Sequence, residues 1–234
     1  MKIHIQDKTK LVNSVFTKVY KRYDFMNDVM SLGVHRLWKR DMINWMRPQE
    51  NSSLIDVASG TGDLAGLFSK KTNNKSKIIC VEPNRGMLEV GKDKLKKFTN
   101  IKWTLASAEK LPFKNSTFDF YTISYGIRNV SNINLCLKEA HRVLKTGGRF
   151  MCLEFSKIQN EVIHSLYKKY SKAIPFIGKY IVGSSMPYSY LVDSIEKFYN
   201  QKELLNLIEN NGFSNVKFRN LSNGISAIHS GWKI

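Results

Sequence analysis

The sequence predicts an α/β protein with a Rossmann-like sheet that is mostly parallel, an antiparallel strand at the C-terminal end, and a helical cap. Three observations predict this fold. Short apolar runs alternate with runs of helical spacing from about residue 53 to residue 155, as in right-handed βαβ units. A tight glycine turn follows the first apolar run. Two strand-like runs near the C-terminus, 216–221 and 225–230, are linked too briefly for a crossover helix and must pair antiparallel.

The elements between residues 53 and 155 follow in a regular order. Five apolar runs of strand length are predicted to form parallel strands: 53–58, 77–81, 101–105, 118–124 and 149–155. Apolar residues at helical spacing predict helices after the first, second and fourth of these strands. Asn84 is a suitable N-cap for the second helix, and Gly147 with Gly148 is expected to end the third.

Two helical additions are expected around this sheet. Residues 1–50 are predicted to form an N-terminal helical cap, in which Trp38, Met42 and Trp45 share one helix face. Residues 160–210 are predicted to form a largely helical lid insertion before the final hairpin. The chain shows no internal repeat and no low-complexity linker, so residues 1–234 are expected to form a single domain.

The glycine turn after the first strand is the sharpest local signal. Gly60, Thr61 and Gly62 allow a tight turn and a close approach by a ligand. Glu82 ends the second strand 20 residues after Gly62, where a carboxylate can accept both hydroxyls of a ribose. The spacing does not match GxGxxG, and Asp63 at the helix start would repel a pyrophosphate. A nucleoside without phosphates, such as S-adenosylmethionine, fits better; the alternative is that the glycines only make a turn.

Two further strand ends are expected to reach the same crevice, because ligands of open α/β sheets bind at the carboxyl ends of the strands. Ser107 and Ala108 follow the third strand, where a small residue lets an adenine ring lie flat. Ser124 ends the fourth strand. The alternative for Ser107 and Ser124 is that each merely ends a strand.

Several segments resemble the UbiE/MenG group of ubiquinone and menaquinone biosynthesis C-methyltransferases, from about Val15 to the C-terminus. The segments are YDFMNDVMS at 23–31, RVLKTGGR at 142–149, DVASGTGD at 56–63 and ISYGIRN at 123–129. The sequence departs from the family pattern at Thr146, where proline is usual, and at Ser59, where glycine is usual. Ser189 replaces an arginine of the family, so any substrate role of that arginine is not transferred.

This resemblance implies the class I S-adenosylmethionine-dependent methyltransferase fold and S-adenosylmethionine as cofactor. The implied contacts are Thr61, Glu82, Ser107 with Ala108, and Ser124, within a turn formed by Gly60 and Gly62. Glu82 stands where the family more often has aspartate, and it still supplies a carboxylate. Ser107 stands where the family more often has asparagine, so the adenine contact lacks an amide.

The implied reaction is methylation of a ring carbon of a polyprenylated hydroquinone, either 2-polyprenyl-6-methoxy-1,4-benzoquinol or demethylmenaquinol. A ring carbon becomes nucleophilic when a neighbouring hydroxyl loses its proton. Arg128 and Asn129, just past Ser124, are the candidate catalytic residues, and Arg128 is suited to stabilise the phenolate or to orient a water. The alternative is that Arg128 caps an element or forms a salt bridge.

Residues of the cap are candidates to line the quinol pocket: Tyr23, Asp24, Asn27 and His35. His35 is the one histidine considered as a proton carrier. The alternative is that this segment fixes the cap on the sheet. The five histidines share no ligand spacing and the three cysteines are widely separated, so neither a metal site nor a disulfide framework is expected.

The charge and hydropathy limit the partners. The chain has 37 Lys and Arg against 19 Asp and Glu, a net charge of +18. No apolar stretch has the ~18 residues of a membrane span, and no secretory signal begins the sequence, so a cytoplasmic location is expected. The stripe Val162, Ile163, Leu166, Tyr167 and Tyr170 is flanked by lysines. It suits either peripheral contact with the anionic inner face of the cytoplasmic membrane or a lid helix with a solvated lysine face.

Two other functions stay open from the sequence. One is an S-adenosylmethionine-dependent methyltransferase of another substrate: either RNA or DNA, which the charge favours, or another small molecule. Against nucleic acid as partner, no Asn-Pro-Pro-Tyr-like segment follows the fourth strand to grip a flipped base. The other is a non-enzymatic nucleotide-binding interaction protein. Contacts with other quinone-biosynthesis enzymes and a homodimer are further expectations that the sequence leaves open.

Overall fold

One seven-stranded sheet organises the chain. The computed structural model describes residues 28, 31, 33–182 and 186–234. Across the sheet the strands are β3 (Ile101–Thr104), β2 (Lys77–Val81), β1 (Ser53–Val57), β4 (Phe118–Ser124), β5 (Leu144–Phe155), β7 (Ser226–Trp232) and β6 (Ser214–Leu221). The first five of these are parallel, whereas β7 is antiparallel to β5 and β6 is antiparallel to β7. The predicted Rossmann-like sheet with its antiparallel end is confirmed.

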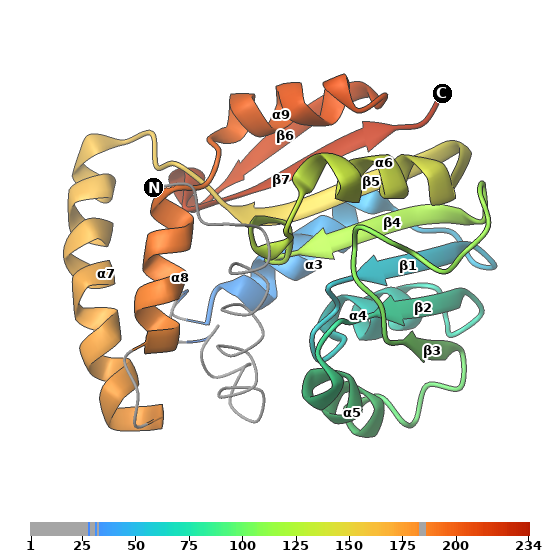
Figure 1. The fold of residues 1–234 in the computed structure, drawn as a ribbon, viewed down its shortest axis with the longest axis horizontal. Helices are drawn as coiled ribbons and strands as arrows, with labels where there is room; N and C mark the ends of the chain where they lie inside the picture. Colours follow the sequence, from blue (N-terminus) through green and yellow to red (C-terminus); the bar gives the residue numbers. More distant parts are fainter. Residues whose placement is uncertain (1–27, 29–30, 32, 183–185) are drawn as a thin grey trace.

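Helices cover both faces of this sheet (Figure 1). They are α3 (His35–Met46), α4 (Asp63–Lys71), α5 (Arg85–Lys94), α6 (Ile133–Val143) and α9 (Gln201–Asn210). Side chains of β5 alternate between the two faces, as the pleat of a strand requires. Met151 packs into the core beneath α3 and α4, and Phe150 packs into the core beneath α6 and α9. The sheet is therefore buried on both sides, which explains the continuous apolar runs of its central strands.

Two helices lie beyond the carboxyl ends of the parallel strands. Figure 1 shows α7 (Glu161–Val182) and α8 (Met186–Glu196) side by side at that edge. Tyr188 and Leu191 of α8 are buried in the same core as α3. Within the segment expected to form the lid insertion, 160–210, the described residues form α7, α8 and α9. The last of these, α9, covers a face of the sheet and buries Leu204 and Ile208 there. The part that stands apart from the sheet faces is α7 with α8.

The N-terminal cap is described only in part. In α3, Trp38 and Met42 are buried against the sheet and Trp45 is half-buried, so the predicted apolar face is confirmed. The ring nitrogen of Trp38 donates to Oγ of Ser222, 3.1 Å away. Three candidate cap residues lie outside the described residues: Tyr23, Asp24 and Asn27.

The boundary between α6 and β5 differs from the prediction. The helix ends at Val143 and the strand begins at once at Leu144, so Gly147 and Gly148 lie inside β5 and do not end the helix. The predicted helix end was wrong because the glycines serve a bend in the strand. Gly147 has a φ of +77°, and its N–H donates to the carbonyl of Lys233 at 2.7 Å.

Candidate active site

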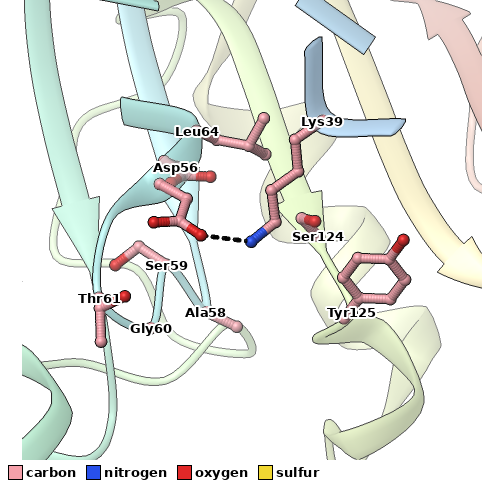
Figure 2. A pocket seen from close by; sticks show the side chains of 10 residues that line it. Lys39, Asp56, Ala58, Ser59, Gly60, Thr61, Leu64, Ser124 and Tyr125 are labelled. Atoms are coloured by element: carbon pink, nitrogen blue, oxygen red, sulfur yellow. Dashed lines mark hydrogen bonds and ion pairs between the residues drawn. The ribbon is translucent and has the colours of Figure 1, made fainter. Parts of the chain in front are cut away.

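A pocket opens at the carboxyl ends of β1 and β4, which are neighbours in the sheet. The chain leaves β1 for α4 on one face and leaves β4 for α6 on the other, and such a switch point is where open α/β sheets bind ligands. Figure 2 shows the side chains that line it. They are Lys39, Asp56, Ala58, Ser59, Gly60, Thr61, Asp63, Leu64, Ser124 and Tyr125.

Two turns meet in this pocket with unusual backbone conformations. Ala58 after β1 and Tyr125 after β4 have φ of +50° and +56°, which costs a residue with a side chain about 1–3 kcal/mol. Gly60 has a φ of +57°, which glycine adopts without strain. A Cβ on Gly126 would lie 2.6 Å from Cβ of Ala58, so glycine is required for the two turns to approach. Strain held by this packing is typical of a functional site.

Glu82 fixes the shape of the glycine turn. Its Oε2 accepts the N–H of Gly60 and its Oε1 accepts the N–H of Asn84, each at 2.9 Å. Burial raises the pKa of Glu82 to about 7, against the two hydrogen bonds that lower it. Asn84 caps α5 as predicted, because its side chain accepts the N–H of Met87. Glu82 therefore joins the ends of β1 and β2 through the glycine turn, whose Gly60 lines the pocket.

Asp56 is a buried carboxyl group in the floor of the pocket. Its Oδ1 accepts the hydroxyl of Thr122 on β4 at 2.7 Å. Burial raises the pKa of Asp56 to about 7, although the bond from Thr122 and the charge of Lys39 act to lower it. Asp56 is 2% exposed, so a change of its charge would be felt throughout the pocket.

Lys39 was not among the residues predicted for the site. It reaches from α3 into the pocket, as Figure 2 shows, and its Nζ lies 2.7 Å from Oδ2 of Asp63. Lys94 of α5 binds the other oxygen, Oδ1, at 2.7 Å and donates to Oγ1 of Thr61 at 3.0 Å. Burial acts to raise the pKa of Asp63, but the two lysines outweigh it and hold the pKa below its usual value. Asp63 is thus neutralised by the protein itself, a partnership that the sequence spacing did not reveal.

Ser124 presents a hydroxyl group to the pocket. Its Oγ is buried and has no hydrogen-bond partner among the described residues. A buried hydroxyl without a partner is destabilising by itself, and native structures avoid it unless a ligand or water serves it. The position of Ser124 beside Tyr125 at the end of β4 makes it available to a bound ligand.

Only some of the other predicted cofactor residues line this pocket. Gly60 and Thr61 line the pocket, and Gly62 begins α4 with a φ of +82°. Ser107 is exposed and Ala108 is buried in the core, and neither lines this pocket. The structure therefore brings the β1 turn and the β4 end together, and Glu82 is bonded to the β1 turn.

Arg128 forms a buried ion pair, the alternative noted from its sequence. Its Nη1 lies 2.6 Å from Oε1 of Glu154 on β5 and donates to the carbonyl of Tyr125 at 2.8 Å. Its guanidinium lies over the ring of Phe155, 5.6 Å from the centroid. Within the described part of the chain, Nη2 makes no hydrogen bond. Arg128 lies in the short helix η2 (Ile127–Asn129), which begins two residues after Tyr125 of the pocket lining.

Asn129 links η2 to α8. Its Oδ1 accepts the hydroxyl of Tyr190 at 3.1 Å, and its Nδ2 is 3.4 Å from the carbonyl of Tyr125. Both ends of the amide are therefore engaged within the protein, which suits a positioning residue.

His35 is held within the cap. Its Nε2 lies 2.9 Å from Oδ1 of Asp28, and burial lowers its pKa. Asp28 also binds Arg36, whose hydrogen bond lowers the pKa of that carboxyl group. These contacts tie Asp28 to the first turn of α3, within the cap. Among the described residues, no group of three His, Cys, Asp or Glu side chains is arranged to hold a metal ion.

A second cavity lies between α7, α8 and the segment that follows β5. Its lining includes Ser156, Lys157, His164, Tyr167 and Ile195. The hydroxyl of Tyr167 is buried without a hydrogen-bond partner among the described residues, and burial raises its pKa to about 12.

Comparison with known proteins settles the family. Residues 3–233 match the model of the ubiE/COQ5 methyltransferase family. The chain belongs to this family. It is 48% identical over 240 residues to the ubiquinone/menaquinone biosynthesis C-methyltransferase UbiE of Rickettsia bellii (strain OSU 85-389), covering 100% of this chain and 96% of that protein. It is 47% identical over 234 residues to the protein of the same name from Brucella abortus (strain S19), covering 97% of this chain and 87% of that protein. The resemblance drawn from the sequence motifs is confirmed.

Solved structures share the fold. A SAM-dependent methyltransferase of Thermotoga maritima superposes with a TM-score of 0.67 at 21% identity, covering 95% of this chain and all of that one. A SAM-dependent methyltransferase of Aquifex aeolicus gives a TM-score of 0.64 at 16% identity, covering 89% and 97%. At these identities the likeness concerns the fold alone. In the part of the chain that the structure describes, no helix combines the length and apolar character needed to cross a bilayer.

Proposed function

We propose that this protein transfers a methyl group from S-adenosylmethionine to a ring carbon of a polyprenylated hydroquinone in ubiquinone or menaquinone biosynthesis. One observation carries the proposal: over its whole length the chain is related to ubiquinone/menaquinone biosynthesis C-methyltransferases. The pocket at the switch point between β1 and β4 supports it.

The residues present fit the cofactor. S-Adenosylmethionine, when bound, supplies an electrophilic methyl group on a positively charged sulfur. The glycine turn admits a ligand close to the backbone, and the orphaned hydroxyl of Ser124 needs a partner. Glu82 would bind the ribose hydroxyls, since each carboxylate oxygen has a second lone pair beyond its bond to a backbone N–H. Ser107 and Ala108, in the loop that follows β3, would border the adenine from outside the lining of the pocket.

Asp56, once ionised, would supply the negative charge that a cationic sulfur favours. Lys39 and Lys94 neutralise Asp63, so this carboxylate does not add its full charge to the pocket. Asp56, in contrast, has no cation bound directly to its oxygens among the described residues. A positively charged ligand beside Asp56 would lower the pKa of that carboxyl group and favour its ionised form.

Arg128 is the proposed catalytic residue on the substrate side. Glu154 and the carbonyl of Tyr125 hold the guanidinium through Nη1, which leaves Nη2 to donate to a quinol oxygen. A donor at that oxygen stabilises the phenolate, and the phenolate raises the electron density on the adjacent ring carbon. Asn129 is proposed as a positioning residue that ties η2 to Tyr190 of α8.

The polyprenyl tail of the proposed substrate is apolar. It would therefore require an apolar cavity in the protein and access to a membrane. The cavity between α7 and α8 is proposed to receive the first isoprene units. On α7, Val162 and Leu166 are 69% and 62% exposed beside Lys168 and Lys169, which suits peripheral contact with an anionic bilayer. A Val162→Ser/Leu166→Ser variant should sediment less with phosphatidylglycerol vesicles than wild type and keep its cofactor affinity.

The function is tested by expression in a host that lacks its own quinone C-methyltransferase. Mass analysis of the quinone pool should show methylated benzoquinones, naphthoquinones or both, and an Arg128→Ala variant should leave demethylated precursors. Accumulation of demethylated precursors alone with the wild-type chain, confirmed to be present and folded, would refute the proposal.

A further inference from the structure

A cluster of arginine and tryptophan side chains lies away from the active-site pocket. The guanidinium of Arg219 on β6 lies over the ring of Trp45, 4.1 Å from its centroid. That of Arg149 on β5 lies 5.3 Å from the centroid of Trp45 and 4.9 Å from that of Trp232. Two positive charges therefore share one tryptophan ring at the end of α3.

Arg149 is buried here without a carboxylate partner. It is 8% exposed, and its hydrogen bonds go to neutral oxygens: Oγ of Ser230 at 2.8 Å and the carbonyls of Trp45 and Met46 at 2.9 and 3.3 Å. Burial, with repulsion from Arg219, lowers the pKa of Arg149 to about 10. A buried cation that lacks a counter-charge is costly, and a second cation beside it adds to that cost.

The cluster lines an open pocket with an excess of positive charge. Arg47, Arg149 and Arg219 contribute to its wall, and Asp41 is the single carboxylate of that lining in the described part of the chain. Neither Arg47 nor Arg219 forms an ion pair with a described residue. The side chains of Asp41, Arg47 and Arg219 are exposed, so a solute can reach the pocket.

This pocket is separate from the proposed methyl-transfer site. In the sheet register Arg149 pairs with Phe120, whereas Ser124 at the active-site end of β4 pairs with Leu153. Four residues along a strand correspond to about 13 Å. The two sites therefore stand at different levels of the sheet, and α3 runs past both, with Lys39 at one and Trp45 at the other.

We propose that the pocket of Arg47, Arg149 and Arg219 is a binding site for a phosphate group. Guanidinium groups offer pairs of N–H donors that match phosphate oxygens, and two or three of them together suit a dianion. The bound anion would supply the counter-charge that Arg149 lacks. The rings of Trp45 and Trp232 already carry guanidinium groups, so the pocket offers no clear stacking surface for a base. A phosphate group on a soluble metabolite and one on a phospholipid head share this chemistry.

Titration with inorganic phosphate tests the site in the full-length protein, at constant ionic strength set with sodium chloride. Saturable binding by calorimetry and a rise of the unfolding temperature with phosphate are expected. Arg219→Gln should weaken phosphate binding by about tenfold, because it removes a charged donor from an exposed position. Arg219→Lys keeps the positive charge but loses the paired N–H donors of the guanidinium. Its phosphate affinity should therefore lie between those of wild type and Arg219→Gln.

Arg40→Gln is the matched control. Arg40 is an exposed arginine on α3 outside the pocket lining, and its replacement removes the same charge. Its phosphate affinity should stay within about twofold of wild type if the site is specific. Equal loss in Arg40→Gln and Arg219→Gln would overturn the proposal, because it would show that net charge alone attracts the anion.

A second arm separates the sources of the phosphate group. Vesicles of phosphatidylcholine with phosphatidylglycerol are compared with vesicles of phosphatidylcholine alone. Loss of vesicle binding in Arg219→Gln, without saturable binding of inorganic phosphate, assigns the site to a lipid head. Saturable binding of inorganic phosphate that Arg219→Gln weakens assigns it to a soluble ligand. If Arg219→Gln alters neither, the site is absent, whatever the outcome of the methyl-transfer experiment.

Discussion

Nη1 of Arg128 lies 2.6 Å from Oε1 of Glu154, and the two side chains are 4% and 1% exposed. Burial raises the pKa of Glu154, although the charge of Arg128 and the hydrogen bonds from Arg128 and Phe155 act to lower it. A buried ion pair adds little net stability when complete, but it is costly to break because the remaining charge stays buried. The pair thus fixes the guanidinium at the end of β4, where the substrate is proposed to bind.

Arg128→Ala should lower the free energy of unfolding at neutral pH by about 3–5 kcal/mol, because Glu154 loses its partner. Part of this loss should be recovered as the pH falls and Glu154 becomes neutral. Turnover should be lost while the affinity for the cofactor stays within a few-fold, since Arg128 is proposed to act on the quinol. Urea denaturation, cofactor titration and a turnover assay measure the three quantities.

The double variant Arg128→Met/Glu154→Leu is the control for folding. It removes both charges, so it should be more stable than Arg128→Ala but equally inactive. A fall in cofactor affinity as large as the fall in turnover would contradict the role on the substrate side.

Only one half of this ion pair could be predicted from the sequence. The segment around Arg128 was recognisable, and a salt bridge was one of the alternatives for it. Its partner was not predictable, because Glu154 is 26 residues away and the contact depends on how β4 and β5 align in the sheet. Lys39 was missed for the same reason: its pairing with Asp63 depends on how α3 docks beside α4.

The fold itself was largely predictable because the alternation of apolar runs and helical spacing fixes the order of elements. The exception is Gly147 with Gly148, where the sequence predicts a helix end and the structure has a strand. Glycine permits a positive φ equally at a helix end and at a bend in a strand, so local sequence cannot separate the two. The pairing of Leu144 with Phe118 decides for the strand.

Ser124→Ala should separate binding from folding. The hydroxyl has no partner among the described residues, so its removal should leave the free energy of unfolding unchanged or slightly higher. Cofactor affinity should fall by a factor of about 3–10, the worth of one neutral hydrogen bond. Thr122→Val on the same strand gives the contrast, because it removes the donor to Asp56 and should cost about 1–3 kcal/mol of stability. Unchanged cofactor affinity in Ser124→Ala would remove this serine from the site.

Gly62→Ala should be strongly destabilising. A Cβ at this position would lie 2.6 Å from Cδ1 of Leu95 and 3.0 Å from Cη2 of Trp103, and the φ of +82° adds backbone strain. Overpacking costs about 1–3 kcal/mol, and the left-handed backbone adds about 1 kcal/mol. Gly147→Ala is the matched control, because its φ is +77° but nothing lies within 4 Å of the added Cβ. Chemical denaturation should show the larger loss for Gly62→Ala, and equal losses would mean that packing at this turn is loose.

The raised pKa of Asp56 makes stability depend on pH in a predictable direction. The carboxyl group has a pKa of about 7 in the folded protein against an ordinary value of 3.8, so between these values the folded state holds the proton and the unfolded state does not. Stability therefore falls as the pH rises from about 4 to 7 and is constant above 7 with respect to this group. A shift of this size corresponds to about 4 kcal/mol.

Asp56→Asn isolates this contribution from the other titrating groups. Asparagine keeps an oxygen for the hydroxyl of Thr122 and cannot ionise, so the variant should gain stability relative to wild type as the pH rises from 4 to 7. Glu82, which is also raised to about 7, titrates in both proteins and cancels in the comparison unless the two carboxyl groups interact. Unfolding in urea at a series of pH values gives the difference directly. A difference that stays constant from pH 4 to pH 7 would mean that Asp56 is ionised in the folded protein throughout, with Lys39 near enough to hold its charge.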